Sequence, residues 1–309
     1  MKTAVIGAGT MGRGIAQAFS QSGYEVWLAD VREDILQHAL KQVKANLSLL
    51  EEVHLLKPKE SEKTIARIHT TLDPRQAVES VDYVTEAVTE DLATKRKIFN
   101  LLEASAPRDA VLASNTSGLS VTDISSKMRT SDRVIGTNWW NPPQIIPLVE
   151  IMTGKNTTGE TLERTRRILT EIGKKPITIL KPIPGFVGNR LQIALLREAL
   201  SLLERGVASI EDIDTAVCFG PGFRYPILGP FRVCDFGGLD VFYHLSEELF
   251  KDLDNSSTPP AKLKRLVESG RMGVKSGGGF YDYRNLQDDI VKDRDRKLLA
   301  ISRAIHGGK

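Results

Sequence analysis

Short apolar runs rich in β-branched residues alternate with longer amphipathic stretches over the first 180 or so residues. This alternation is typical of a parallel sheet whose strands are joined by crossover helices. We expect seven strands, at residues 3–6, 25–29, 82–86, 110–114, 133–137, 148–152 and 177–180. Between the second and third strands, the leucine pattern of residues 33–68 predicts a helical hairpin packed on the sheet.

The pattern changes at the segment KPIPGFVGNR, where Pro182 and Pro184 end any preceding element and Gly185 permits a turn. The residues that follow show an apolar stripe with helical spacing. The sequence therefore predicts an α/β protein in two parts. These are an N-terminal doubly wound domain of the Rossmann type, residues 1–183, and an all-helical C-terminal domain, residues 184–309.

Composition excludes several classes of protein. The 309 residues, 41% hydrophobic and 26% charged, suit a globular protein of two domains. The 42 basic and 39 acidic residues are spread along the chain, without the dense basic runs that bind nucleic acid. No apolar stretch reaches the length of about 18 residues that spans a membrane. We expect a cytoplasmic protein, with Cys218 and Cys234 as reduced thiols.

A glycine-rich turn follows the first predicted strand directly and opens a helical pattern. Its predicted cofactor-binding residues are Gly7, Gly9, Thr10, Met11 and Gly12, in the spacing G-x-G-x-x-G. Glycines there allow a tight turn and let a pyrophosphate approach the backbone at the N-terminus of the helix. Asp30 ends the second strand, where a carboxylate accepts the ribose hydroxyls and repels a 2′-phosphate. We therefore expect NAD rather than NADP, although Arg32 close by would favour a phosphate.

Five further blocks occur in a fixed order along the chain. They read EAVTEDLATKRKIF, ASNTSGLSVTDI, GTNWWNPPQIIPLVEIM, PGFVGNRL and GRMGVKSGGGFYDY. In this order and spacing the chain resembles the 3-hydroxyacyl-CoA dehydrogenase family over nearly its whole length. The resemblance implies an NAD-dependent oxidoreductase of fatty acid metabolism that oxidises the 3-hydroxyl of (S)-3-hydroxyacyl-CoA to 3-oxoacyl-CoA. It also implies a homodimer built by the C-terminal domain.

The resemblance assigns roles to individual residues. Glu90 and Lys95 match residues that line the nicotinamide half of the cofactor, and Lys275 matches a lysine that reaches NAD from the second domain. Ser117 matches a serine that contacts both substrate and cofactor, and Asn189 matches a residue that holds the substrate oxygen. The alternatives are a solvated surface charge for the three charged residues, a turn residue for Ser117 and a helix cap for Asn189.

Asn138 stands where the family has its catalytic histidine, 12 residues before Glu150. Glu150 matches the carboxylate that orients this histidine. An asparagine can form a hydrogen bond with a hydroxyl or ketone oxygen, but it cannot take the proton that leaves an oxidised alcohol. Three explanations stay open: an engineered substitution, another base such as Glu150 acting directly or through water, and an NAD-binding protein without activity.

Two features bear on the substrate. Relatives that use CoA thioesters hold CoA with a serine and a lysine at the positions of Asn46 and Val53, and these contacts are not reproduced. Nearby lysines offer either CoA contacts or a solvated helix face; they are Lys41, Lys44, Lys57 and Lys59. In the second domain, GPGFRYPILGPF resembles members that act on small free acids, such as L-gulonate 3-dehydrogenase in the lambda-crystallin-like branch. There Arg224 would donate two hydrogen bonds to a carboxylate. We expect an acyl-CoA substrate, with a small hydroxy acid as the alternative.

Overall fold

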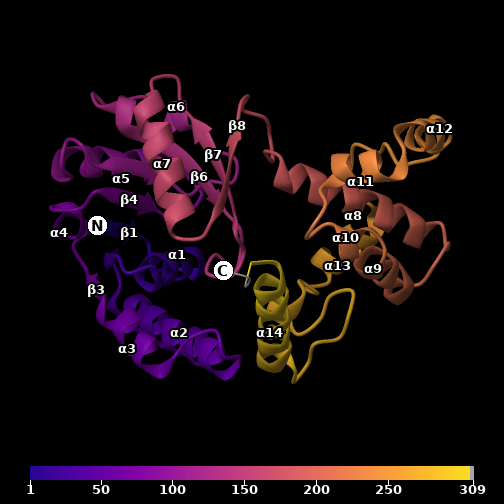
Figure 1. Ribbon diagram of the computed structural model, residues 1–309, viewed down its shortest axis with the longest axis horizontal. Helices are drawn as coiled ribbons and strands as arrows, with labels where there is room; N and C mark the ends of the chain where they lie inside the picture. The colour runs from indigo at the N-terminus through magenta and orange to yellow at the C-terminus, as the bar shows by residue number, and fades with distance from the viewer. Residues whose placement is uncertain (307–309) are drawn as a thin grey trace. The chain divides into compact units, whose positions relative to one another are not determined.

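The computed structural model describes residues 1–306 and divides the chain into two units, Met1–Val187 and Gly188–Lys309. An eight-stranded sheet forms the centre of the first unit (Figure 1). The strand order is β3-β2-β1-β4-β5-β6-β7-β8. The strands are β1 (Lys2–Ile6), β2 (Glu25–Ala29), β3 (Ile68–Thr71), β4 (Tyr83–Glu86), β5 (Val111–Ser114), β6 (Val134–Trp139), β7 (Leu148–Thr153) and β8 (Lys175–Ile179). The order reverses between β1 and β4, which is the arrangement of a doubly wound sheet. The predicted fold class is therefore confirmed.

Two details of the predicted sheet are wrong. Residues 68–71 form β3 and pair with β2, so the hairpin predicted to reach residue 68 ends two residues earlier, at Ala66, and the sheet gains an eighth strand. This short edge strand carries only one buried side chain and gives a weak pattern. In addition, β7 runs antiparallel to β6, whereas every other neighbouring pair is parallel. Residues 140–147, which join β6 to β7, are too few for a crossover.

Helices cover both faces of the sheet. They are α1 (Thr10–Gln21), α2 (Glu33–Glu52), α3 (Pro58–Ala66), α4 (Pro74–Val78), α5 (Leu92–Ser105), α6 (Val121–Ile124) and α7 (Gly159–Glu171). One apolar cluster joins α1, α2 and α7 to the sheet, and a second joins α4, α5 and α6 to the opposite face. Consecutive residues of β1 alternate between them: Val5 packs in the first cluster, and Ala4 and Ile6 pack in the second.

Polar caps set where several helices begin. The Asp91 carboxylate accepts a hydrogen bond from the Thr94 amide at 2.8 Å and opens α5. The Thr158 hydroxyl accepts one from the Thr161 amide at 3.2 Å and opens α7. Each such cap contributes about 1 kcal/mol to helix stability. Helix α1 differs, because Gly9 precedes it and no side chain caps its first turn.

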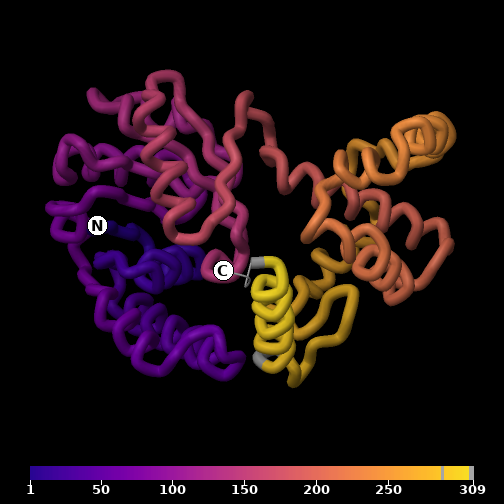
Figure 2. The backbone as a smooth tube through the Cα atoms, in the orientation of Figure 1, coloured from indigo at the N-terminus to yellow at the C-terminus, as the bar shows by residue number. Residues whose placement is uncertain are grey.

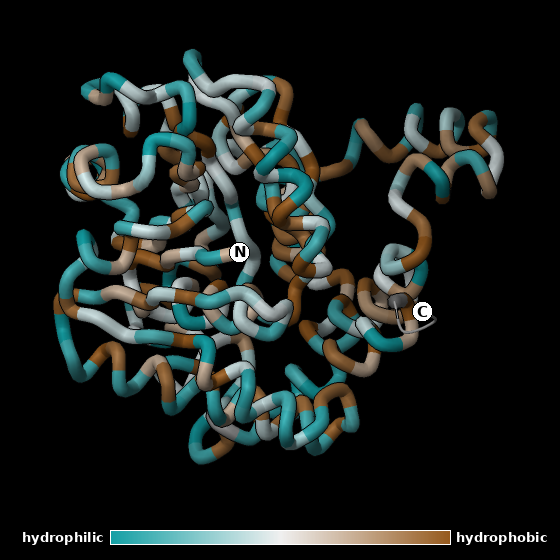
Figure 3. The backbone as a smooth tube through the Cα atoms, turned by 60° about the vertical axis from the view of Figure 1, so that its left-hand side comes forward, coloured by the Kyte–Doolittle hydropathy of each residue, from teal (hydrophilic) through white to brown (hydrophobic). Residues whose placement is uncertain are grey.

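The second unit is helical over its described part, apart from isolated bridges near residue 278. Its helices are α8 (Gly188–Glu204), α9 (Ile210–Phe219), α10 (Pro221–Arg224), α11 (Pro230–Gly237), α12 (Leu239–Leu249), α13 (Ala261–Glu268) and α14 (Gln287–His306), which Figure 2 shows as successive turns of the tube. Hydrophobic residues recur along these helices (Figure 3), yet Leu200, Val233 and Leu299 are the only buried large apolar side chains described in the unit. Within residues 1–306, no helix has the length and apolarity of a membrane span.

Candidate active site

The glycine-rich turn joins β1 to α1 at the carboxyl edge of the sheet. Gly7 has a φ of 100°, in the left-handed region that favours glycine. A Cβ on Gly12 would lie 1.7 Å from the Gly7 carbonyl oxygen, so α1 packs against the turn only because that side chain is absent. Around Gly9 the space is open, with no atom within 4 Å of a Cβ placed there. Thr10 is exposed and Met11 is half-buried beside it.

Asp30 ties the end of β2 to this turn. Its carboxylate accepts hydrogen bonds from the Ala8 amide at 2.8 Å and from the Arg32 amide at 3.3 Å. The guanidinium of Arg32 is held by the carboxylate of Asp34 through two hydrogen bonds. The cation that would favour a 2′-phosphate is therefore engaged by a neighbouring anion.

These features fit a dinucleotide at the turn. The first amides of α1 have no side-chain cap, and a helix N-terminus with such amides binds the negative charge of a pyrophosphate. The open space at Gly9 lets that group approach the backbone. Asp30 stands at the next strand end, where ribose hydroxyls would lie.

A buried ion pair lies next to the turn, at the end of β4. The Lys95 ammonium is 2.8 and 2.9 Å from the two oxygens of Glu86 and 3.1 Å from the Asn115 carbonyl oxygen. Both side chains of the pair are fully buried. Burial raises the pKa of Glu86, and the Lys95 charge and a hydrogen bond from Ser114 oppose that change. The alternative that Lys95 is a solvated surface charge is therefore wrong, and its direct partner Glu86 is a residue that the sequence analysis missed.

Glu90 holds the loop that carries Ser117. Its carboxylate accepts hydrogen bonds from the Thr116 hydroxyl at 2.5 Å, the Ser117 amide at 2.8 Å and the Gly118 amide at 3.2 Å. Lys95 lies 3.4 Å away. Partial burial would raise the pKa of Glu90, but these hydrogen bonds and the Lys95 charge outweigh it and lower the pKa. Glu90 is thus an anion that fixes the exposed Ser117 at the edge of the sheet.

Asn138 and Glu150 form the next part of the site. They are directly paired across the antiparallel strands β6 and β7. The Asn138 amide nitrogen donates to Glu150 Oε2 at 2.8 Å, Trp140 Nε1 donates to the same oxygen at 3.3 Å, and the Val187 amide donates to Glu150 Oε1 at 2.9 Å. Asn138 is 5% exposed and Glu150 has no exposed surface. Asn138 and Trp140 thus both donate to one oxygen of a carboxylate that is itself buried.

A second buried lysine, also missed from the sequence, holds the loop beyond Asn138. The Lys174 ammonium donates to the Pro143 carbonyl oxygen at 2.5 Å and to the Ile146 carbonyl oxygen at 3.0 Å, and it lies 5.3 Å from the centre of the Trp139 ring. Burial lowers the pKa of Lys174 to about 8. A Cβ on Gly14 would contact Pro143 at 2.6 Å, so this loop packs against α1. The only signal in the sequence was a lysine between a glycine turn and a strand.

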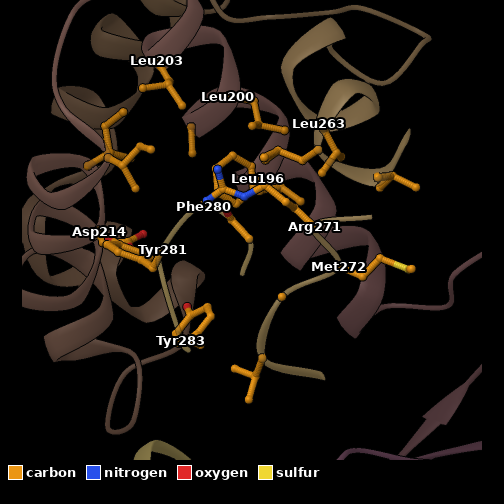
Figure 4. Close-up of a pocket in the computed structure, with 18 of the residues that line it drawn as sticks. Leu196, Leu200, Leu203, Asp214, Leu263, Arg271, Met272, Phe280, Tyr281 and Tyr283 are labelled. Atoms are coloured by element: carbon orange, nitrogen blue, oxygen red, sulfur yellow. Dashed lines mark hydrogen bonds between the residues drawn. The ribbon is translucent and has the colours of Figure 1, made fainter. Parts of the chain in front are cut away.

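Asn189 and Lys275 belong to the second unit. Asn189 is half-buried in the first turn of α8, and Lys275 is exposed in a short 3-10 helix, Val274–Ser276. Lys275 lines a cavity of about 680 Å³ within that unit, which Figure 4 shows among α8, α9, α13 and residues 271–283. The Tyr281 hydroxyl in this cavity donates to Asp214 at 2.7 Å, and this hydrogen bond raises the pKa of Tyr281 to about 12. The role of Lys275 at the cofactor and that of Asn189 at the substrate stay predictions.

Metal chemistry has no support among the described residues. Over residues 1–306, no cluster of three or more histidine, cysteine or acidic side chains could hold an ion. Cys218 and Cys234 are both free thiols. The first unit therefore offers a dinucleotide turn, an anchored serine loop and an asparagine amide backed by a buried carboxylate.

Comparisons with known proteins agree with this geometry. A family model described as the 3-hydroxyacyl-CoA dehydrogenase NAD binding domain matches residues 2–183, and the model of that family's C-terminal domain matches residues 185–283. The chain is 33% identical to the 5-formyl-3-hydroxy-2-methylpyridine 4-carboxylate 5-dehydrogenase of Mesorhizobium japonicum over 98% of both chains. It is 37% identical to the human mitochondrial hydroxyacyl-coenzyme A dehydrogenase over 91% of this chain and 90% of the other. A crystal structure of a 5-dehydrogenase of the same pyridine carboxylate, described as an NAD+ dependent dismutase, covers 100% of this chain and 99% of its own at 32% identity, with a TM-score of 0.91.

Proposed function

The chain belongs to the 3-hydroxyacyl-CoA dehydrogenase family of NAD-dependent oxidoreductases, and on this premise we propose that its substrate is a small hydroxy acid with a free carboxylate. NAD accepts the hydride in this reaction. The sequence favours an acyl-CoA substrate, whereas side-chain contacts in the structure support a free acid.

One observation in α2 carries this choice. The Asn46 side chain, at the position of a CoA-binding serine, donates to Gln17 Oε1 at 2.9 Å and so faces α1. Val53, at the position of the CoA-binding lysine, directly follows the last residue of α2 and has no polar side chain. Neither residue is available to hold CoA.

Arg224 offers the anchor that a free acid needs. It ends α10, it is exposed, and no ion pair joins it to a carboxylate among the side chains that the structure describes. A guanidinium can bind a carboxylate through two parallel hydrogen bonds. The relative from Mesorhizobium japonicum is named for a substrate with such a carboxylate, which supports the same substrate class here.

A (S)-3-hydroxyacyl-CoA of fatty acid metabolism is the second candidate. The human relative is named for that substrate class. Exposed lysines on α2 and at the start of α3 would also suit the phosphates of CoA; they are Lys41, Lys44, Lys57 and Lys59.

Roles for the site residues follow from their contacts. The first amides of α1 would bind the pyrophosphate and Asp30 the adenosine ribose. Glu90 and Ser117 would border the nicotinamide, while the buried Lys95 would act on the cofactor through Glu90 and not by direct contact. Asn138 would bind the substrate oxygen, and Glu150 would orient Asn138.

We also propose that the chain forms a homodimer through its second unit. Five phenylalanines from the last residue of α9 to the residue after α12 are 73–84% exposed; they are Phe219, Phe223, Phe231, Phe236 and Phe250. Apolar surface of this extent marks an interaction site. Light scattering on the purified chain should give a mass of two copies, and a monomer at micromolar concentration would contradict the proposal.

The substrate proposal is tested by NADH formation on a panel of alcohols and one aldehyde, which would be oxidised as its hydrate. The panel contains 3-hydroxybutyrate, L-gulonate, the formyl pyridine carboxylate of the relative and 3-hydroxybutyryl-CoA. We expect oxidation of at least one free acid with NAD, and none of the thioester. Oxidation of the thioester alone would establish the second candidate. Tight NADH binding without oxidation of any compound would instead indicate an NAD-binding protein without activity.

A further inference from the structure

The amide of Asn138 has a defined orientation. Glu150 accepts hydrogen bonds from Asn138 Nδ2 at 2.8 Å, Trp140 Nε1 at 3.3 Å and the Val187 amide at 2.9 Å. Glu150 Oε2 accepts hydrogen bonds from both Asn138 and Trp140, so turning Asn138 over would place one acceptor oxygen against another. The buried Glu150 therefore holds the nitrogen of Asn138 and directs Oδ1 away from itself.

Asn138 Oδ1 is available to a ligand. No residue among the described 1–306 donates a hydrogen bond to it. Some surface of this oxygen is accessible, because it has no partner among these residues and yet does not belong to the inaccessible polar atoms without a partner. The residue as a whole is 5% exposed. Glu150 is the titratable group that Asn138 contacts.

This arrangement copies one state of a histidine and glutamate pair. A neutral imidazole held by a carboxylate donates from one ring nitrogen and accepts at the other. Asn138 likewise donates to Glu150 and leaves Oδ1 as an acceptor for a ligand. An imidazole can then take up a proton and donate to a ketone oxygen, but a carboxamide has no such state. The second N–H of Asn138 is on the nitrogen that Glu150 holds, so a ketone oxygen bound there would lie beside the carboxylate charge.

We propose that Asn138 recognises the hydroxyl group of the substrate, as an alcohol or a hydrated aldehyde, and selects it against the corresponding ketone. The inference rests on the proposed function, in which the substrate oxygen lies at Asn138. The hydroxyl donates to Oδ1, whereas a ketone has no hydrogen to donate and loses this contact.

Binding of matched alcohol and ketone probes tests the selection. The first pair is the alcohol 3-hydroxybutyrate with the ketone acetoacetate. The second pair is the alcohol 3-hydroxybutyryl-CoA with the ketone acetoacetyl-CoA. Calorimetry would use the alcohols with the NADH-loaded protein and the ketones with the NAD-loaded protein, so that no turnover occurs. Asn138→His, measured with the same cofactors, removes the contribution of the cofactor from the comparison.

We expect the ratio of alcohol to ketone affinity to be about threefold to tenfold higher in the wild type than in Asn138→His at pH near 6, the effect of one hydrogen bond. The wild-type ratio should stay constant from about pH 6 to about pH 8, while the variant turns toward the ketone as its imidazole gains a proton. A wild-type ratio equal to that of the variant over this range overturns the proposal.

A measurement without a substrate separates this inference from the proposed function. In nitrogen-15 NMR spectra, the side-chain N–H signals that disappear in Asn138→Asp belong to Asn138. One of them should exchange slowly with solvent because it is bonded to Glu150. Fast exchange of both protons would show that Glu150 does not hold the amide, and the acceptor assignment would fall. If no probe binds but the slow proton is present, the proposed substrate class is wrong and the fixed acceptor stands.

Discussion

Asn138 and Glu150 face each other across β6 and β7, and the amide nitrogen of Asn138 lies 2.8 Å from the carboxylate of Glu150. A side chain at position 138 is therefore already oriented by a buried carboxyl group. Asn138 itself, unlike a histidine at this position, cannot take the proton of a bound hydroxyl.

Replacing Asn138 by histidine should supply a group that can take this proton. Glu150 would fix the tautomer of the imidazole, and the rate of alcohol oxidation should rise about 10²-fold or more, as expected of a general base. The measurement is the turnover number for NADH formation, with Asn138→Gln as a control that lengthens the side chain without adding a base. No gain on a substrate that binds and turns over would mean that the site uses a different proton acceptor.

Two glycines of the cofactor turn should respond differently to alanine. In Gly12→Ala the new Cβ would fall 1.7 Å from the Gly7 carbonyl oxygen, so the first unit should be strongly destabilised. In Gly9→Ala no atom lies within 4 Å, so the free protein should fold normally but bind NAD at least about tenfold more weakly. Thermal unfolding and NADH titration of the two variants separate these effects. Equal NADH affinity in Gly9→Ala and the wild type would place the pyrophosphate elsewhere.

Cofactor preference should depend on two carboxylates. Asp30→Ala should weaken NADH binding, because the ribose hydroxyls lose their acceptor. Adding Asp34→Ala releases Arg32 from its ion pair, so the double variant should bind NADPH better than Asp30→Ala alone does. Fluorescence titration, using the three tryptophans, measures both affinities. If the wild type binds NADPH as tightly as NADH, the role of Asp30 is wrong.

Lys174 should make stability depend on pH in an alkaline window. Its pKa in the folded protein is lowered to about 8 from an ordinary value of 10.5, so the unfolded chain binds more protons between these values. Stability should therefore rise with pH across this window, by about 1.4 kcal/mol for each unit by which the two pKa values differ.

In Lys174→Met this rise should disappear, because the titrating group is gone. At neutral pH the variant should also lose stability, since the Pro143 and Ile146 carbonyl oxygens lose their donor. Urea unfolding at several pH values gives the comparison, with the exposed neighbour Lys175→Met as the control. A rise that persists in Lys174→Met would assign it to another group.

The two candidate substrate classes predict opposite effects of basic residues. For a free acid, Arg224→Ala should cost about 1.5–3 kcal/mol of binding, at least a tenfold loss of affinity. For a CoA thioester, Arg224→Ala should matter little, whereas removing Lys41, Lys44 and Lys57 together should raise KM with little change in kcat. Steady-state kinetics on both classes decide between them, and no effect of either variant on any substrate would exclude both models.

The sequence by itself determined the parts of this protein that depend on neighbouring residues. The turn of Gly7, Gly9 and Gly12 could be predicted because a strand, a tight turn and a helix follow one another within a few residues. Asp30 could be placed because the end of a strand is a local feature. The replacement of a base by Asn138 was also visible directly.

The tertiary structure decided what depends on residues far apart in the chain. The short strand β3 exists because β2 supplies its hydrogen bonds, and the direction of β7 is set by its pairing with β6. Lys95 is buried and not a surface charge because it forms an ion pair with the buried Glu86 at the end of β4. A buried charge is tolerated only with such a partner. The orientation of the Asn138 amide likewise follows from Glu150 on the neighbouring strand, because the amide donates its N–H to that carboxylate. The sequence of β6 alone does not show which group faces Asn138.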